Sequence, residues 1–446
     1  MRSSLFTTPA MREVFSDASR LARMLEFEAA LAKAEAHLGV IPADAADVIV
    51  AQCDVAQYDV AAIDDAMQAA GNLAIPLVAA LTRNVGAVDA RAKGYVHYGA
   101  TSQDAIDTGL VLQLRDALVL IDADLVHLAQ ALAQQSRRHA GTIMPGRTWL
   151  QQALPITLGM KLALFVSALD RHRERLEQAR HADLVLQFGG AAGTLASLGA
   201  NGLAVGDALG DELGLDVPDA SWHAHRDRLC DVAAVLGMLV ATLGKLGHDL
   251  ALLAQTEVAE AREAAAPGRG GSSTMPQKSN PVGASVAIAA SVRVPGLVAT
   301  MLAASVQEHE RGLGNWAAEW ETLPEIVMLA AGALAAMLDV VRSLDVDADR
   351  MRRNLELTNG LVFAEAVQMA LAPSIGRDTA HALVAHACRR AVAEGVHLRD
   401  ILARDPDVTR HLSSERIAAL FDARNDLGAS DALVERALAR HPLRGH

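Results

Sequence analysis

The chain has 446 residues, a formal net charge of −13, and 51% hydrophobic but only 3% aromatic residues. This length predicts about two to four domains, and an apolar surface made mainly of Ala, Leu and Val favours helices over strands. The acidic charge, without a long Lys/Arg run, excludes nucleic acid as a partner, because a phosphate backbone needs a basic face. It leaves an anionic substrate possible, since only the field inside a cleft matters for binding.

The cysteines and the N-terminus indicate where in the cell the protein is located. Cys53, Cys230 and Cys388 are odd in number and far apart in the sequence, which is typical of reduced thiols. The first fifteen residues lack the apolar core of a signal peptide, and no window reaches the roughly 18 uncharged apolar residues of a membrane span. We therefore expect a soluble, cytoplasmic protein.

The first predicted element is a helix from Ser19 to Leu38. Met24, Phe27 and Leu31 recur at helical spacing, and Gly39 ends the pattern. Several shorter helices are expected to follow up to about Val88. We assign these elements to an N-terminal helical domain, residues 1–105.

Longer helices are expected between about residues 105 and 345. A continuous leucine-rich seam with a 4-3-4 spacing from Leu114 to Leu132 predicts a helix of about 30 residues. Four further apolar helices are expected, at Leu158–Leu176, Val232–Leu253, Val282–Ala304 and Ile326–Leu344. Long helices bury their seams against one another, so residues 106–345 are predicted to form a central bundle that also packs against other subunits. Residues 346–446, with shorter and more charged segments, are expected to form a small helical domain.

A polar island lies immediately before the first long helix, from His97 to Asp104. Thr101, Ser102 and Asp104 are suited to capping that helix, which alone explains their presence. The alternative is that the hydroxyl groups and free amides at a helix start bind a carboxylate. The two interpretations are compatible.

Two further islands follow. The residues from Gly146 to Ala153 again precede a long helix, and the segment from Gln187 to Thr194 is rich in glycine. The second segment lacks the Lys-Ser/Thr ending of a phosphate-binding loop, so we predict a helix-linking turn instead of a nucleotide site. Arg226 and Arg228 lie in a polar helix entry, where either one is equally suited to a structural ion pair.

The segment from Gly270 to Val282, GGSSTMPQKSNPV, has the composition of a catalytic loop. Its glycines let the backbone approach a ligand, and Ser272 and Ser273 offer hydroxyl groups and amides together. Lys278 and Asn280 supply a cation and an amide that are suited to holding carboxylates. We define residues 268–282 as the serine loop.

This loop resembles the GSSxMPxKxNP signature of the fumarase/aspartase superfamily, and the two polar islands resemble its HxGxTSxD and GRTHxQ regions. The resemblance covers nearly the whole chain. It implies an all-α, L-aspartase-like fold of three helical domains, and a homotetramer whose active sites are shared between subunits. It also implies that Ser272 handles a proton at carbon.

The chain departs from the second signature at Trp149. Adenylosuccinate and argininosuccinate lyases carry a histidine there as the general acid, and an indole cannot shuttle a proton near neutral pH. A lyase that protonates an amine leaving group is therefore disfavoured. The resemblance is to the branch that closes a lactone within a tricarboxylate diene in aromatic catabolism, where the leaving group of the reverse reaction is a carboxylate.

The expected site follows from these motifs. Ser272 and Ser273 are the catalytic candidates, and a larger set is expected to bind substrate: His97, Thr101, Ser102, Arg147, Thr148, Trp149, Lys278 and Asn280. Arg147 has the alternative of an interior ion pair. No cofactor is expected, and the spacing of the 16 histidines predicts no metal site. The rival functions are another lyase of the superfamily, such as an adenylosuccinate-lyase-like enzyme, and a noncatalytic protein on this scaffold, as lens crystallins are.

Overall fold

The protein is described by a computed structural model that covers residues 4–264, 270–271, 274–275 and 277–441. It divides into two compact units, each assembled from three stretches of chain. Unit 1 comprises Met1–Leu125, Arg171–Gly244 and Val286–Ala336, and unit 2 comprises Val126–Asp170, Lys245–Ser285 and Met337–His446. The division into domains at residues 105 and 345 stays a prediction.

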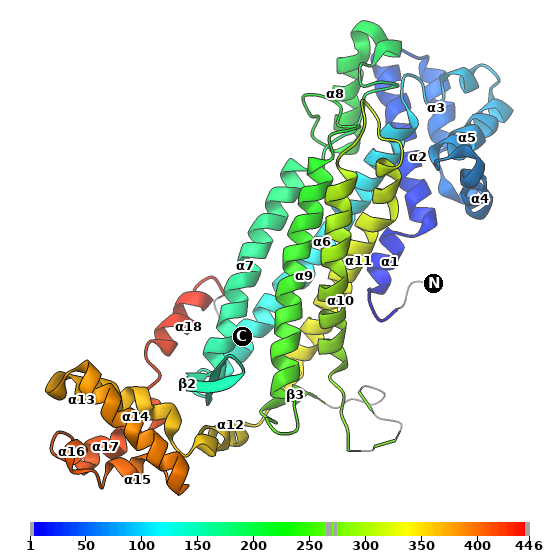
Figure 1. Cartoon of the computed structure of the whole chain (residues 1–446). Coiled ribbons are helices and arrows are strands. Elements are labelled where there is room, and N and C mark those ends of the chain that lie inside the picture. The colour runs from blue at the N-terminus through cyan, green and yellow to red at the C-terminus, as the bar shows by residue number, and fades with distance from the viewer. Residues whose placement is uncertain (1–3, 265–269, 272–273, 276, 442–446) are drawn as a thin grey trace. The chain divides into compact units, whose positions relative to one another are not determined.

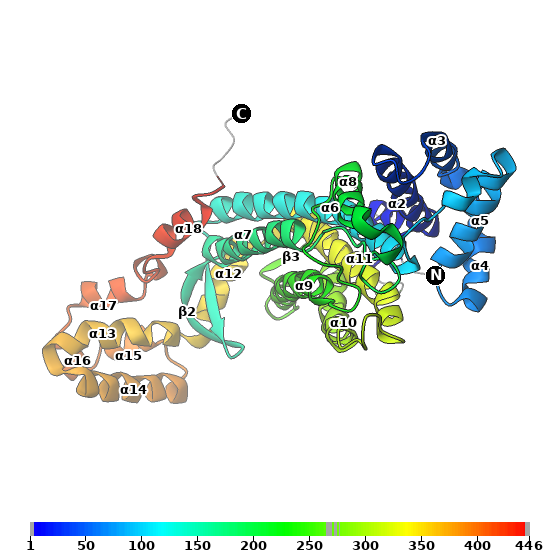
Figure 2. The same ribbon diagram turned by 90° about the horizontal axis from the view of Figure 1, so that it is seen from above.

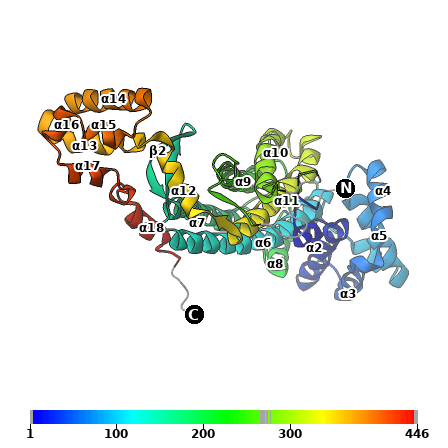
Figure 3. The ribbon, with the colours of Figure 1, turned by 90° about the horizontal axis from the view of Figure 1, so that it is seen from below.

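Short helices precede the first long one in unit 1. They are α1 (Pro9–Val14), α2 (Asp17–His37), α3 (Ala43–Ala51), η1 (Val55–Gln57), α4 (Val60–Ala70), α5 (Ala74–Val88) and η2 (Ala92–Tyr95), and Figure 3 shows α2 to α5 grouped together. The Ser16 side chain caps α2 by accepting a hydrogen bond from the Ser19 amide at 3.1 Å. Gly39 follows α2 with a φ of 70°, as a helix-ending glycine requires.

Five long helices dominate the chain (Figure 1). They are α6 (Ser102–Arg138), α7 (Leu158–Ala182), α9 (Asp227–Leu253), α10 (Val282–Ala304) and α11 (Asn315–Arg342). Within unit 1 they pack closely where glycine removes a side chain. A Cβ on Gly244 of α9 would meet the Ser291 side chain of α10 at 2.3 Å, and one on Gly109 of α6 would meet Met24 of α2 at 3.1 Å. The prediction of at least five long helices between residues 105 and 345 is confirmed.

The rest of unit 1 is a glycine-rich loop followed by η3 (Ala196–Asn201) and α8 (Gly202–Leu213). Leu209 and Val205 of α8 are fully buried, and α8 packs against α2. Figure 1 shows both helices in the same part of the molecule. This arrangement places the loop at residues 184–195 beside the start of α6, where the first polar island lies.

Unit 2 contains two small antiparallel sheets that the sequence did not predict. Strand β1 (Ile143–Thr148) pairs with β2 (Gln151–Thr157), and β3 (Ala261–Glu263) pairs with β4 (Leu344–Val346). The island at residues 146–153 is therefore a hairpin. Glu263 at the end of β3 caps α10, because its carboxylate accepts hydrogen bonds from the amides of Gly283 and Ala284 at 3.1 and 2.8 Å.

The C-terminal part of unit 2 is helical. It contains α12 (Ala348–Leu355), η4 (Glu356–Thr358), η5 (Leu361–Phe363), α13 (Ala364–Ile375), α14 (Arg377–Glu394), α15 (Leu398–Leu402), α16 (Pro406–Thr409), α17 (Ser414–Leu420), η6 (Ala423–Asn425) and α18 (Ser430–Leu438). Figure 2 shows α13 to α16 stacked together. Val367, Leu371, Val384 and Leu402 form part of their shared apolar core. The all-α class is confirmed, and the two small sheets are local additions to it.

Three helices are long and apolar enough to cross a membrane when only length and composition are considered, and we did not expect this from the sequence. They are α9, α10 and α11, each of which carries charged residues within its apolar stretch. The structure buries 61% of the apolar window in α9 and 78% in α11, but only 28% of that in α10. Helices α9 and α11 therefore use their apolar surface inside the protein, and α10 leaves most of its surface uncovered within one chain.

Candidate active site

The first polar island forms the N-terminus of α6. Thr101 precedes the helix, and the Asp104 carboxylate accepts a hydrogen bond from the Thr101 amide at 3.0 Å. This is one half of a capping box, so the capping interpretation of Asp104 is correct. Thr101 and Ser102 are half-buried, whereas every residue from Gln103 to Leu112 is buried. Both residues lie at a helix N-terminus, where an anion is stabilised.

Asp104 also organises the glycine-rich loop. Its carboxylate accepts hydrogen bonds from the amides of Gly189 and Gly190, each at 3.0 Å, and it lies 2.7 Å from Nε2 of His223. The two amides that would bind a phosphate in a nucleotide loop are therefore already satisfied by a buried carboxylate. This supports the prediction that the segment is a turn with a structural role.

His97 is held beside this helix start by Glu28 of α2. Nδ1 of His97 lies 2.6 Å from Oε1 of Glu28, which is 2% exposed. His97 adopts a φ of 56°, an unusual value for a residue with a side chain. Burial lowers the pKa of His97, but the charge and hydrogen bond of Glu28, with a further contribution from Asp104, outweigh burial and leave the pKa above its ordinary 6.5. Glu28 therefore favours the cationic form of the imidazole, the form that suits a carboxylate ligand.

A second carboxylate accompanies this pair. Glu35 lies seven residues after Glu28 on α2, is fully buried, and has no hydrogen-bond partner for either oxygen among the described residues. Burial, with a smaller contribution from the charge of Glu28, raises the pKa of Glu35 to about 8. Glu35 is therefore mostly protonated at neutral pH, which leaves Glu28 as the charged partner of His97.

Replacing Glu28 with glutamine is expected to lower the pKa of His97 below 6.5. The charge that raises this pKa is lost while the burial that lowers it remains. The His97 to Glu28 pair stabilises the fold below the ordinary histidine pKa and loses this effect as the pH rises through the raised value. The variant should therefore lose more stability at pH 5.5 than at pH 8.5.

The measurement is an NMR titration of the His97 ring, assigned by its loss in His97→Gln, together with thermal unfolding at the two pH values. Glu26→Gln is the matched control, because Glu26 lies on the same helix and pairs with Arg23 instead. An unchanged titration of His97 in Glu28→Gln would show that Glu28 does not set its charge.

The second island lies at the tip of the β1–β2 hairpin in unit 2. Thr148 pairs with Gln151, so Trp149 and Leu150 form a two-residue loop. Both have positive φ angles, 53° and 61°, a conformation that hairpins usually give to Asn-Gly. The Trp149 side chain is 98% exposed and that of Leu150 is 81% exposed. Two large apolar side chains therefore project from a strained turn without a partner in the described part of unit 2.

Arg147 of β1 makes an ion pair with a buried carboxylate. Its two terminal nitrogens lie 2.9 and 2.6 Å from the carboxylate oxygens of Glu260, which is fully buried. Asn354 donates a further hydrogen bond to Glu260 at 2.7 Å. The interior ion pair that we considered for Arg147 is therefore present. Substrate binding by Arg147 stays a prediction. It is compatible with the ion pair, because the guanidinium has further N–H groups.

Ser272 and Ser273 lie outside the described residues. Around them, Gly271 bridges to Ser279 in an antiparallel manner, and the Asn280 amide donates to the Gly270 carbonyl at 2.7 Å. Gly270 has a φ of 68°, and a Cβ there would meet the Asn280 carbonyl oxygen at 2.6 Å. A side chain at Gly270 would therefore be strained. The backbone contacts hold residues 270–271 against residues 279–280.

Lys278 and Asn280 line a cavity of about 920 Å³ in unit 2. Glu260, which binds Arg147, lines the same cavity, as do Asp345 and Asp347 beside β4. The structure thus brings Lys278, Asn280 and the partner of Arg147 together in unit 2, and it brings His97, Thr101 and Ser102 together in unit 1.

A lyase family model matches residues 5–296, and a model of the adenylosuccinate lyase C-terminus matches residues 360–437. The first match alone covers more than half of the chain.

The chain belongs to the lyase family.

The lyase is 57% identical over 436 residues to the 3-carboxy-cis,cis-muconate cycloisomerase of Pseudomonas aeruginosa, with 98% of this chain and 95% of the relative covered. It is 56% identical over 412 residues to the Pseudomonas putida protein of the same name, with 92% and 98% covered. The crystal structure of 3-carboxy-cis,cis-muconate lactonizing enzyme from Pseudomonas putida matches with a TM-score of 0.93 at 53% identity, and 98% of each chain is covered. The resemblance to the fumarase/aspartase superfamily and its fold is confirmed.

Two carboxylates of the lyase were missed by the sequence reasoning. Glu28 lies within the apolar seam of α2, between Phe27 and Leu31, and Glu260 follows the end of α9 without a distinctive motif. An acidic residue within an apolar seam was a usable signal for Glu28, because a buried charge requires a partner. No such signal marked Glu260, whose partner lies 113 residues away in the sequence.

Proposed function

We propose that this lyase converts 3-carboxy-cis,cis-muconate to 4-carboxymuconolactone, a step in protocatechuate catabolism through the β-ketoadipate pathway. The observation that carries the proposal is the similarity, along 98% of the chain, to a relative named 3-carboxy-cis,cis-muconate cycloisomerase. Trp149 agrees with the proposed reaction. Tryptophan cannot act as the acid that an amine leaving group needs, whereas this reaction does not need one.

The chemistry divides into bond formation and proton delivery. One terminal carboxylate oxygen of the substrate bonds to the distal double-bond carbon, and the electron pair of that double bond moves toward the other terminal carboxylate as a dianionic aci-form. A proton then reaches the carbon next to this carboxylate. In reverse the leaving group is a carboxylate with a pKa of about 4, so it departs without protonation.

Ser272 is proposed to carry the proton at carbon. In lactone formation its hydroxyl group gives a proton to carbon. In the reverse direction its alkoxide removes that proton. The amides near Ser272 and Ser273, with Lys278 and Asn280, are proposed to stabilise the aci-form, because preorganised donors act where charge develops. Lys278 and Asn280 support this role since they line one cavity.

The three substrate carboxylates need several cationic or N–H donors. His97 is suited to one of them because Glu28 keeps its pKa raised. Thr101 and Ser102 offer hydroxyl groups and amides at the start of α6. Arg147 and Thr148 on the hairpin are proposed to hold another carboxylate, next to Trp149.

The active enzyme is proposed to be a cytoplasmic homotetramer with shared active sites. Trp149 is 98% exposed, so it needs a covering surface to form the wall of a pocket, and a second copy of the chain is proposed to supply that surface. The surface of α10 supports this assembly, because most of its apolar window is uncovered within one chain. The half-buried or buried free thiols of Cys53, Cys230 and Cys388 agree with a reducing compartment.

Trp149→Ala is expected to lower kcat/KM for 3-carboxy-cis,cis-muconate by about 10- to 100-fold, since burying a large apolar side chain contributes about 1.5–3 kcal/mol. The melting temperature of the separated subunit should be unchanged, because the side chain makes almost no intrachain contact. Steady-state kinetics measures the first effect, and thermal unfolding of the separated subunit measures the second. Leu150→Ala, at the neighbouring loop position, is the control, and equal activity of Trp149→Ala and wild type would remove the side chain from the pocket.

Product analysis tests the proposed reaction directly. The enzyme is incubated with 3-carboxy-cis,cis-muconate in D₂O, and the product is examined by NMR. The expected result is 4-carboxymuconolactone with one deuterium at the carbon next to a carboxylate. Release of fumarate from adenylosuccinate, with the muconate unchanged, would instead favour the adenylosuccinate-lyase-like alternative, which the match at residues 360–437 keeps as the second candidate.

A further inference from the structure

The loop between α10 and α11, residues 305–314, brings an arginine to the first turn of α6. Nε of Arg311 donates a hydrogen bond to Oε1 of Gln103 at 3.0 Å, and Gln103 directly follows Ser102 in the sequence. Nη2 of Arg311 donates a second hydrogen bond to the Ala191 carbonyl of the glycine-rich loop at 3.2 Å. Arg311 therefore joins three segments of unit 1 at the N-terminus of α6.

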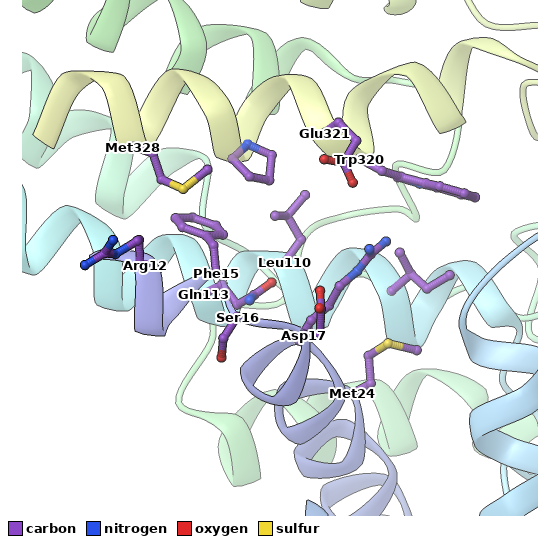
Figure 4. A pocket seen from close by; sticks show the side chains of 14 residues that line it. Arg12, Phe15, Ser16, Asp17, Met24, Leu110, Gln113, Trp320, Glu321 and Met328 are labelled. Atoms are coloured by element: carbon purple, nitrogen blue, oxygen red, sulfur yellow. The ribbon is translucent and has the colours of Figure 1, made fainter. Parts of the chain in front are cut away.

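The packing of α11 explains why this loop lies there. The Trp316 indole in the first turn of α11 donates a hydrogen bond to Asp107 of α6 at 3.1 Å. Figure 4 shows Trp320 and Glu321 of α11 and Leu110 of α6 around one pocket, which side chains of both helices line. The loop that precedes α11 is therefore held against the first turns of α6.

Gln103 is a fixed anchor for Arg311. Its side chain is fully buried, and Nε2 donates hydrogen bonds to Oδ2 of Asp107 at 3.0 Å and to the His223 carbonyl at 2.9 Å. The opposite amide orientation would place donors against each other at Arg311 and an acceptor against the Asp107 carboxylate. The amide oxygen therefore faces Arg311 and determines the direction of the guanidinium.

The charge of Arg311 is not neutralised within the described part of the chain. Its two acceptors are uncharged, and it forms no ion pair with a described carboxylate. The carboxylate of Glu308 in the same loop accepts a hydrogen bond from a backbone amide instead. Arg226, by contrast, lies 2.6 Å from both Asp107 and Glu319.

This environment favours an anion beside Arg311. The positive end of the α6 dipole lies there, and a helix N-terminus stabilises anions and not cations. The two hydrogen bonds of Arg311 leave three of its five N–H groups for other acceptors. Arg311 is also only half-buried, so part of the side chain is accessible to a ligand.

We propose that Arg311 binds a substrate carboxylate together with Thr101 and Ser102, and that Gln103 is the positioning residue that directs its guanidinium. The inference rests on the proposed function of this site and adds a cation that the signature motifs did not identify. A guanidinium offers paired donors that match a carboxylate. Because arginine stays charged at every relevant pH, this contact favours substrates that carry a carboxylate at this end.

Binding of tricarballylate to the full-length enzyme, measured by isothermal titration calorimetry, tests the role of Arg311. This saturated tricarboxylate cannot close a lactone, so its binding is measured without turnover. Arg311→Met should weaken binding by at least about ten-fold, because a hydrogen bond to a charged group is lost. Arg311→Lys should weaken it a few-fold, because lysine keeps the charge but not the paired donors.

Arg115→Met is the matched control. Arg115 is another half-buried arginine, its Nη1 donates to the Leu213 carbonyl at 2.8 Å, and it lies on α6 thirteen residues after Ser102. This spacing corresponds to about 20 Å along the helix at 1.5 Å per residue. The control variant should bind tricarballylate like the wild type.

A double-mutant cycle tests the positioning role of Gln103. Gln103→Met should weaken tricarballylate binding several-fold when Arg311 is present and should have little further effect in the Arg311→Met background. A purely structural role of Gln103 would give the same loss in both backgrounds and would overturn this part of the proposal. Thermal unfolding of each variant checks that it is folded.

Turnover of 3-carboxy-cis,cis-muconate by the wild type separates this inference from the proposed function. Turnover combined with wild-type affinity of Arg311→Met for tricarballylate would overturn the inference and leave the proposed reaction intact. Binding that depends on Arg311 without any turnover would support the inference and reject the reaction. If Arg311→Met did not fold, equal binding by Arg311→Lys and the wild type would overturn the inference, as would no wild-type binding of tricarballylate at 20 mM.

Discussion

Ser272→Ala is expected to lower kcat for 3-carboxy-cis,cis-muconate by at least about 10³-fold. A positioned proton-transfer group typically contributes about 10²- to 10⁴-fold to the rate. Alanine removes the hydroxyl group that is proposed to deliver the proton to carbon and leaves the amides that stabilise the aci-form. Substrate binding should therefore persist while turnover is lost. Stopped-flow kinetics and equilibrium binding of the substrate measure the two effects separately.

Ser279→Ala is the matched control for this variant. Ser279 is an exposed serine of the same loop, and its contact with Gly271 is made by the backbone. It should retain nearly all activity. If Ser272→Ala turned over substrate within a few-fold of Ser279→Ala, serine would have no part in proton transfer, and a different residue would have to carry it.

Arg226→Met is expected to destabilise the protein by about 3–5 kcal/mol, the cost of removing one partner from a buried ion pair. Arg226 is 1% exposed and lies 2.6 Å from a carboxylate oxygen of both Asp107 and Glu319, which are also buried. The Trp222 ring lies 4.8 Å from its guanidinium carbon. Methionine would leave two buried carboxylates without their cation.

The loss should depend on pH in a definite direction. Burial already raises the pKa of Glu319, and Arg226 opposes this effect. Without Arg226 the folded-state pKa of Glu319 rises further above its unfolded value, so the variant should lose stability as the pH increases from 5 to 8. Urea unfolding at both pH values measures this.

Arg228→Met provides the control for Arg226→Met, since Arg228 lies two residues later and is only half-buried. Its change in unfolding free energy should be below about 0.5 kcal/mol, as is usual for a side chain with such solvent access. Equal stability of the two variants would mean that the buried network around Asp107 does not support the fold.

The long helices were predictable because each must bury a continuous seam. The apolar period alone located α10 with its observed bounds and α9 to within a few residues at its start. For α11 the prediction began at Ile326, whereas the helix begins at Asn315. The added segment includes Glu319. A charged residue is usually exposed, so its buried position was not recognised, and its partner Arg226 lies 93 residues away in the sequence.

The two small sheets were not predictable from local patterns. The β1–β2 turn contains Trp149-Leu150 where Asn-Gly is usual, so the ordinary hairpin signal is absent. Strands β3 and β4 have three residues each and pair across about eighty positions in the sequence. Such short strands form because the long helices bring their ends together, which is tertiary information.

The candidate site was predictable as a set of motifs but not as a network. Thr101, Ser102 and the serine loop were identified from residue types at helix starts and beside glycines. The carboxylates that contact His97 and Arg147 were not identified. Glu28 lies 69 residues from His97 in the sequence, and Glu260 lies 113 residues from Arg147. Only folding shows that Glu28 contacts His97 and that Arg147 already holds a carboxylate.

The measurement that tests the central claim most directly is the ultraviolet absorbance of 3-carboxy-cis,cis-muconate mixed with the purified enzyme. Lactone formation removes the conjugated diene, so absorbance should fall rapidly with the wild type and remain constant with Ser272→Ala. Constant absorbance with well-folded wild-type enzyme would contradict the proposed reaction.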